Sequence, residues 1–93
     1  MNKLTIAIDY DDTYTADPVF WNRVIQLAKE HNHNMICVTA RSHENRQELI
    51  NSLPEGMTTY FSHDEPKADY IKRQNIVVDI WIDDSPGWIV GIT

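Results

Sequence analysis

The sequence predicts an α/β fold with a mostly parallel sheet and helices on both faces. Strand-like and helix-like segments alternate in the order βαβαβαβ, which is typical of this class. The apolar runs Ile6–Ile8 and Ile36–Val38 are nearly continuous, as in parallel strands that are buried on both faces. Each run is followed by polar residues. We therefore expect a three-layer, Rossmann-like fold. In such sheets ligands bind beyond the carboxyl ends of the strands, so we expect the functional site among these polar residues.

The first strand is predicted over residues 3–8, and the first helix follows an Asp-Pro pair. Asp17 suits the N-cap position, and Pro18 suits the first helical position because it needs no donor there. Apolar residues then recur at helical spacing until about His31. A second buried strand is predicted over residues 35–38.

The second half of the chain continues the alternation. Ser42 is predicted to cap a second helix, which Pro54 ends. A weaker third strand covers residues 57–61, Pro66 opens a third helix, and residues 79–82 form a fourth strand.

The C-terminal residues 88–92 have strand-forming composition, but only Ser85-Pro86-Gly87 separates them from the fourth strand. This connection is too short for a parallel crossover. We therefore expect an antiparallel edge strand or an irregular tail.

Length and composition favour one globular domain over residues 1–93. The net charge of −6 argues against unaided binding to nucleic acid. No run approaches the roughly 20 apolar residues of a membrane span, and no signal peptide is evident, so we expect a cytoplasmic protein without a membrane partner. Cys37 lies in an apolar run and is interpreted as a buried hydrophobe.

A carboxylate pair, Asp9 and Asp11, follows the first strand. If the chain turns sharply there, one carboxylate can attack phosphorus and the other can move the proton. A solvated Asp-rich turn is the simpler interpretation. A calcium-binding loop is excluded, because its sixth and twelfth positions would be Tyr14 and Phe20 in place of Gly and Glu.

Other polar residues follow the later strands. Thr39 ends the second strand, where a hydroxyl usually satisfies local backbone, and Arg41 is either a phosphate clamp or a solvated charge. We expect Lys67 at an exposed position in the first turn of a helix, where a cation opposes the macrodipole and so suggests a bound anion. The paired acids Asp83 and Asp84 either cap a turn or bind Mg²⁺, which prefers hard oxygen ligands.

The histidines and tryptophans receive no catalytic role. His43 and His63 are interpreted as surface residues of loops near the site. Trp21, Trp81 and Trp88 are interpreted as packing residues.

Taken in order, these segments resemble the haloacid dehalogenase (HAD) superfamily of aspartate-nucleophile phosphatases. Its four motifs are matched by Asp9-Tyr10-Asp11-Asp12-Thr13, by Ile36-Cys37-Val38-Thr39, by Lys67 and by Ile80-Trp81-Ile82-Asp83-Asp84. Lys72 is the weaker match for the third motif because it lies deeper in its helix.

The resemblance implies a Mg²⁺-dependent phosphatase that forms an aspartyl-phosphate. Asp9 would attack the phosphoryl group, Asp11 would act as acid and then base, and Thr39 and Lys67 would hold the transferring oxygens. The resemblance also implies the Mg²⁺ ligands: the Asp9 carboxylate, the Asp11 backbone carbonyl and the Asp83 carboxylate, with Asp84 assisting.

Family members often carry a cap domain, but residues 9–17 and 62–66 leave no room for one at either usual insertion point. A capless site is open, so we expect efficient turnover to require a large phosphorylated substrate or an oligomer in which a neighbour acts as the lid. A nucleic-acid end is the less favoured substrate because of the net charge.

Two other hypotheses remain. One is a catalytically silent HAD-like module that binds metal or phosphate and acts through a protein partner. The other is a phospho-acceptor receiver domain, which needs an Asp at the end of its third strand, where this chain has Tyr60-Phe61-Ser62.

Overall fold

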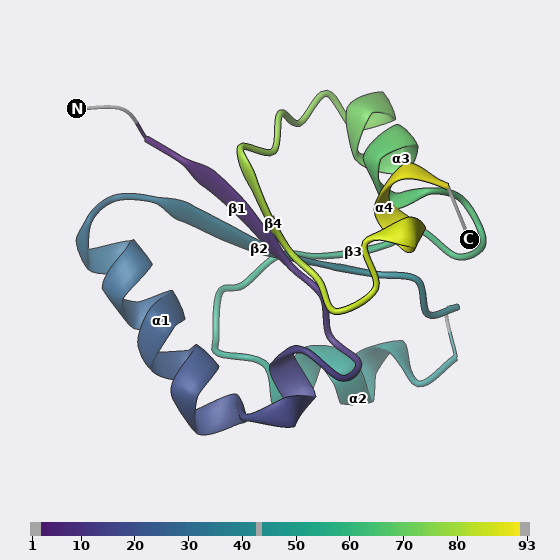
Figure 1. The fold of residues 1–93 in the computed structure, drawn as a ribbon. Helices are drawn as coiled ribbons and strands as arrows, with labels where there is room; N and C mark the ends of the chain where they lie inside the picture. Colours follow the sequence, from purple (N-terminus) through teal and green to yellow (C-terminus); the bar gives the residue numbers. More distant parts are fainter. Residues whose placement is uncertain (1–2, 43, 92–93) are drawn as a thin grey trace.

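Four parallel strands form one sheet in the computed structural model, which describes residues 3–42 and 44–91 (Figure 1). The strands are β1 (Thr5–Ile8), β2 (Asn34–Thr39), β3 (Thr59–Phe61) and β4 (Ile80–Ile82), and their order across the sheet is β3-β2-β1-β4. All three strand pairs are parallel. The predicted α/β class and parallel sheet are therefore confirmed, and the topology is compatible with a Rossmann-like fold.

The helices are α1 (Pro18–Glu30), α2 (Arg46–Ser52), α3 (Lys67–Arg73) and α4 (Gly87–Val90), with a short 3-10 helix, η1 (Tyr14–Ala16), before α1. Helix α1 begins as predicted, because the side chain of Asp17 accepts a hydrogen bond from the Phe20 N–H at 3.2 Å. Helix α2 begins later than predicted, since its N-cap is Asn45 and not Ser42.

Two groups of buried apolar residues pack on alternate positions of the strands. Ile8 and Cys37 belong to one group, which includes residues of α1 and α2. Ala7 and Ile36 belong to the other, which includes Ile71 of α3. Figure 1 shows α1 and α2 on one side of the sheet and α3 and α4 on the other. Burial raises the pKa of the Cys37 thiol to about 12, which agrees with its interpretation as a hydrophobe.

The prediction of an edge strand or irregular tail over residues 88–92 is wrong for the described residues, which end at Gly91. The chain forms helix α4 instead. Its N-cap, Pro86, has helical backbone angles, and the Gly91 N–H donates to the Gly87 carbonyl at 2.9 Å. Gly91 ends the helix with a positive φ of 81°, a conformation that glycine adopts easily. The Pro-Gly turn and packing on α3 override the strand propensity.

The chain crosses from β3 at one edge of the sheet to β4 at the other. Strand β1 therefore has its sequence neighbour β2 on one side and the returning strand β4 on the other. This reversal creates a crevice at the carboxyl ends of β1 and β4. The end of β3 is followed by Ser62 and not by Asp, which argues against a receiver domain.

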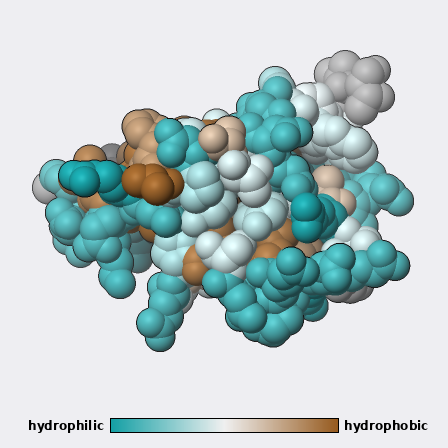
Figure 2. All heavy atoms as spheres, turned by 90° about the horizontal axis from the view of Figure 1, so that it is seen from below, coloured by the Kyte–Doolittle hydropathy of each residue, from teal (hydrophilic) through white to brown (hydrophobic). Residues whose placement is uncertain are grey.

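The surface formed by α1 and α2 is mainly hydrophilic, with separate hydrophobic patches between the polar side chains (Figure 2). The exposed apolar residues of α1 include Val19, Phe20 and Leu27. Single exposed apolar residues of this kind are normal for a protein surface. No helix within residues 3–42 and 44–91 has the length and apolar character needed to cross a membrane.

Candidate active site

A hollow of about 330 Å³ lies at the carboxyl ends of the strands. All seven site residues predicted from the sequence line it: Asp9, Asp11, Thr39, Arg41, Lys67, Asp83 and Asp84. Asp12, Ala40, Ser85 and Trp88 complete the lining. His63 is not among these residues, and His43 lies outside the part of the chain that the structure describes. The structure thus brings together predicted site residues that are up to 75 positions apart in the chain, from Asp9 to Asp84.

The strand register explains why Asp9 and Asp83 are neighbours. Ile8 pairs with Ile82, and these are the last residues of β1 and β4. The residue that follows each of them is an aspartate, so the two aspartates lie side by side. The Asp9 N–H donates to the Ile82 carbonyl at 2.9 Å and extends the ladder by one residue. Side chains alternate along a strand, so Asp9 follows Ala7 toward the face of the sheet that α3 covers.

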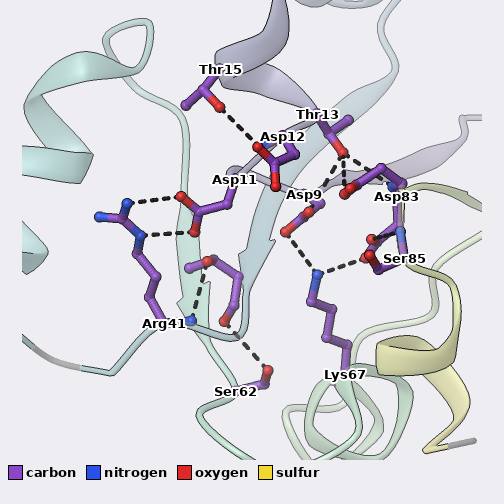
Figure 3. A network of polar contacts seen from close by, with 12 residues as sticks. Asp9, Asp11, Asp12, Thr13, Thr15, Arg41, Ser62, Lys67, Asp83 and Ser85 are labelled. Carbon is purple, nitrogen blue, oxygen red and sulfur yellow. Dashed lines mark hydrogen bonds and ion pairs between the residues drawn. The ribbon is translucent and has the colours of Figure 1, made fainter. Parts of the chain in front are cut away.

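Lys67, the first residue of α3, lies between these two carboxylates (Figure 3). Its Nζ atom is 2.8 Å from Asp9 Oδ1 and 2.6 Å from Asp83 Oδ2. Its side chain is only 2 % exposed, so the prediction of an exposed position is wrong. The start of α3 faces the strand ends, and the ion pairs offset the cost of burying the ammonium group. Lys72 is exposed, which favours Lys67 as the third-motif residue.

The site carries an excess of negative charge. Among the described residues, five carboxylates and two cationic side chains line the hollow, and their formal charges sum to −3. The pKa of Asp9 is raised to about 6, chiefly because the carboxyl group is buried. Lys67 acts to lower this pKa, and the nearby Asp83 and Asp84 act to raise it. A phosphate ester would therefore be repelled unless a cation entered with it.

Three of these carboxylates fit a metal ion. Oxygens of Asp9, Asp83 and Asp84 lie within 4.8 Å of one another. Asp83 is fixed on its second oxygen as well, since Oδ1 accepts a hydrogen bond from the Ser85 N–H at 2.9 Å. Carboxylate oxygens keep further lone pairs after such contacts. The donor set suits Mg²⁺, which binds few carboxylates and retains water ligands.

Thr13 is a residue whose role the sequence did not reveal. Its hydroxyl donates to Asp84 Oδ1 at 3.0 Å and accepts from the Asp84 N–H at 3.2 Å. The hydrogen bond that the Thr13 hydroxyl donates lowers the pKa of the Asp84 carboxyl group. Thr13 therefore joins the loop after β1 to the loop after β4. Its place in the first motif was a signal, but its partner is far away in sequence.

The sharp turn that the carboxylate-pair hypothesis requires is present after β1. The Tyr14 N–H donates to the Asp9 carbonyl at 3.2 Å, and the Thr15 N–H donates to the Tyr10 carbonyl at 3.1 Å. Asp12 adopts a positive φ of 62°, and its N–H donates to the Thr15 hydroxyl at 3.0 Å. These contacts bring Asp11 back over the strand end beside Asp9 (Figure 3).

The side chain of Asp11 is held by an ion pair with Arg41, whereas Asp9 and Asp83 are paired with Lys67. Arg41 Nε and Nη2 donate to the two Asp11 oxygens, each at 2.8 Å. The guanidinium carbon lies 5.3 Å from the Tyr10 ring centroid, and the Tyr10 hydroxyl contacts Ser52 Oγ at 2.7 Å. Arg41 thus orients the side chain of Asp11. A phosphate contact of Arg41 and a metal contact of the Asp11 carbonyl stay predictions.

Thr39 is the last residue of β2 and is 1 % exposed. Its hydroxyl accepts a hydrogen bond from the Arg41 N–H at 3.3 Å, which is the local backbone role expected of such a residue. The buried Ser62, which directly follows β3, supports Thr39, because the Ser62 N–H donates to the Thr39 carbonyl at 2.9 Å. No pattern in the sequence singled out Ser62.

Comparison of the chain with family models, with curated proteins and with solved structures finds no significant match.

If the site carries out the phosphoryl chemistry that the sequence motifs imply, replacing Lys67 by Ala is expected to lower hydrolysis of a phosphate ester by about 10²–10³-fold, comparable to removing one preorganised donor to the transition state. Lys72→Ala, at an exposed position of the same helix, should have little effect. Steady-state kinetics with a generic aryl phosphate measure both.

Loss of the ammonium group also leaves Asp9 and Asp83 unpaired, and breaking a buried ion pair costs about 3–5 kcal/mol. Circular dichroism must therefore show that Lys67→Ala is folded at the assay temperature. If Lys72→Ala were the inactive variant, the assignment of the third motif would be wrong.

Proposed function

We propose that this chain is a Mg²⁺-dependent phosphatase of the HAD superfamily, with a single three-layer core over residues 1–93 and no cap domain. The observation that carries the proposal is the position of Asp9. Its carboxylate lies against Lys67, within 4.8 Å of carboxylate oxygens of Asp83 and Asp84, and in the same hollow as Asp11. Side chains with the chemistry expected of a nucleophile, an acid-base group and charge-stabilising groups thus line one hollow, which supports the proposal.

In this proposal the carboxylates of Asp9, Asp83 and Asp84 hold Mg²⁺, together with the Asp11 backbone carbonyl. The bound cation would neutralise charge on the transferring phosphoryl group and lower its repulsion from Asp9. The formal charge of −3 in the hollow supports a divalent cation there. Lys67 can remain paired with Asp9 and Asp83, since carboxylate oxygens accept more than one contact.

Asp9 starts the reaction. A carboxylate oxygen of Asp9 attacks phosphorus, the bond from phosphorus to the ester oxygen breaks, and an aspartyl-phosphate forms. Asp11 donates a proton to the departing oxygen. Asp11 then takes a proton from water as that water attacks phosphorus, which releases inorganic phosphate and restores the Asp9 carboxylate. Lys67 and Thr39 stabilise the transferring oxygens.

Arg41 has two tasks in this scheme. It orients Asp11 through the two hydrogen bonds described above. Its side chain is 43 % exposed at the rim of the hollow, so one of its N–H groups can turn to an incoming phosphate. Arginine suits such a contact because its planar donors match phosphate oxygens.

Asp9→Asn is expected to abolish turnover while keeping the fold, because an amide cannot act as the nucleophile. Asp69→Asn, an exposed position on α3, is the matched control and should keep wild-type activity. Release of inorganic phosphate from an aryl phosphate, with and without Mg²⁺, is the measurement.

Substantial turnover by pure Asp9→Asn protein would contradict the covalent mechanism. If the wild-type protein binds Mg²⁺ but hydrolyses no phosphate ester of a broad panel, the catalytically silent module becomes the better account.

Mg²⁺ should raise the melting temperature. Binding to the native state alone adds about 2.7 kcal/mol to the free energy of unfolding at a hundredfold excess over Kd. Asp83→Ala should remove most of this increase, whereas Asp69→Ala should keep it. Thermal unfolding at millimolar MgCl₂ is compared with NaCl of equal ionic strength. An unchanged melting temperature in the wild-type protein would argue against the metal site.

A further inference from the structure

Trp88 lines the same hollow as the catalytic groups, although the sequence suggested a packing role. It is 42 % exposed, and within residues 3–42 and 44–91 it is the one aromatic residue that lines the hollow. We propose that Trp88 is an aromatic wall of the site, and that the preferred substrates are phosphate monoesters whose leaving group carries a flat unsaturated ring, as in a nucleoside monophosphate or an aryl phosphate. This inference rests on the proposed function.

The loop after β4 carries the proposed metal ligands Asp83 and Asp84, and it leads directly into helix α4, which carries Trp88. The Ser85 N–H donates to Asp83 Oδ1 at 2.9 Å, and the Trp88 N–H donates to the Ser85 carbonyl at 3.0 Å. The backbone of Trp88 is therefore fixed relative to a carboxylate of the proposed metal site by two successive hydrogen bonds.

A close contact between helices fixes Trp88 relative to Lys67 as well. Figure 1 shows α4 beside α3. A Cβ atom added at Gly91 would lie 2.8 Å from Pro66 Cγ, closer than such atoms normally approach. Pro66 directly precedes Lys67, so the absence of a side chain at Gly91 lets the end of α4 rest against the start of α3. The short helix that carries Trp88 is thus held against the start of the helix that carries Lys67.

The lining of the hollow has two chemical parts. The carboxylates, Lys67 and Arg41 suit a phosphate group and a cation, whereas Trp88 and Ala40 offer apolar surface. A simple sugar phosphate would leave the exposed indole surface in contact with water. A flat ring can cover it, because aromatic rings stack on one another and any base has a π-face. The volume of about 330 Å³ is at the lower end of the range for small-molecule sites.

The test compares three substrates with Mg²⁺: adenosine 5′-monophosphate, phenyl phosphate and ribose 5-phosphate. For Trp88→Ala we expect the ratio of kcat/KM between a ring-bearing substrate and ribose 5-phosphate to fall about tenfold, within the range for removing a stacking aromatic. Trp88→Phe should restore most of the ratio. Phe20→Ala, an exposed aromatic on α1, is the control and should leave the ratio unchanged.

The two ring-bearing substrates distinguish the source of the ring. A fall for adenosine 5′-monophosphate alone indicates a nucleotide, and a fall for phenyl phosphate alone indicates an aryl ester. Equal effects of Trp88→Ala on all three substrates, or no effect on any, would overturn the proposal and leave Trp88 as a structural or partner-contacting residue.

A binding measurement separates this inference from the proposed function. Calorimetric titration of adenosine 5′-monophosphate into Asp9→Asn, with Mg²⁺, is compared with the same titration of the Asp9→Asn, Trp88→Ala double variant. About tenfold weaker binding to the double variant supports the aromatic wall even if no ester is hydrolysed. If phosphate esters are hydrolysed, but removal of the Trp88 ring changes neither the kcat/KM ratio nor the affinity for adenosine 5′-monophosphate, the aromatic wall is refuted and the proposed function stands.

Discussion

The site depends on one interaction, the buried pair of ion pairs that the Lys67 ammonium group makes with Asp9 and Asp83. Two adjacent parallel strands both end in aspartate, and the strand register places these like charges side by side. Without a cation between them the carboxylates would repel one another, and the ends of β1 and β4 would be hard to pair. Helix α3 supplies the cation from its first residue, so the packing of this helix and the charge balance of the site depend on each other.

The loops around this ion pair are fixed by few contacts. Thr13 joins the loop after β1 to Asp84, and Arg41 joins the end of β2 to Asp11. Each contact connects a different pair of strand ends, so Asp84 and Asp11 are oriented by contacts between loops as well as by their own turns. Burial is the main reason that the pKa of Asp9 is raised, and Asp83 and Asp84 add to it. The negative charge that remains among the described lining residues favours a cation in the hollow.

The sequence predicted the parallel sheet and the seven residues that meet in the hollow, because the apolar runs of β1, β2 and β4 are each followed by polar residues and Lys67 follows a helix-opening proline. It did not predict the burial of Lys67, which depends on the direction from which α3 reaches the sheet. The bond from Thr13 to Asp84 and the place of Trp88 were missed for the same reason, since both depend on distant parts of the chain meeting. The C-terminal residues were mispredicted because β propensity was weighed above the Pro-Gly turn.

The most direct test of the central claim is to trap the phosphoryl group on Asp9. The Asp11→Asn variant is mixed with 4-nitrophenyl phosphate and Mg²⁺, quenched in acid and digested for mass spectrometry. The 4-nitrophenolate departs without a proton, whereas hydrolysis of the acyl phosphate lacks its base, so the intermediate should accumulate. The account predicts one phosphoryl group on the peptide that contains Asp9. Release of 4-nitrophenolate over many turnovers with no phosphoryl group on that peptide would contradict it.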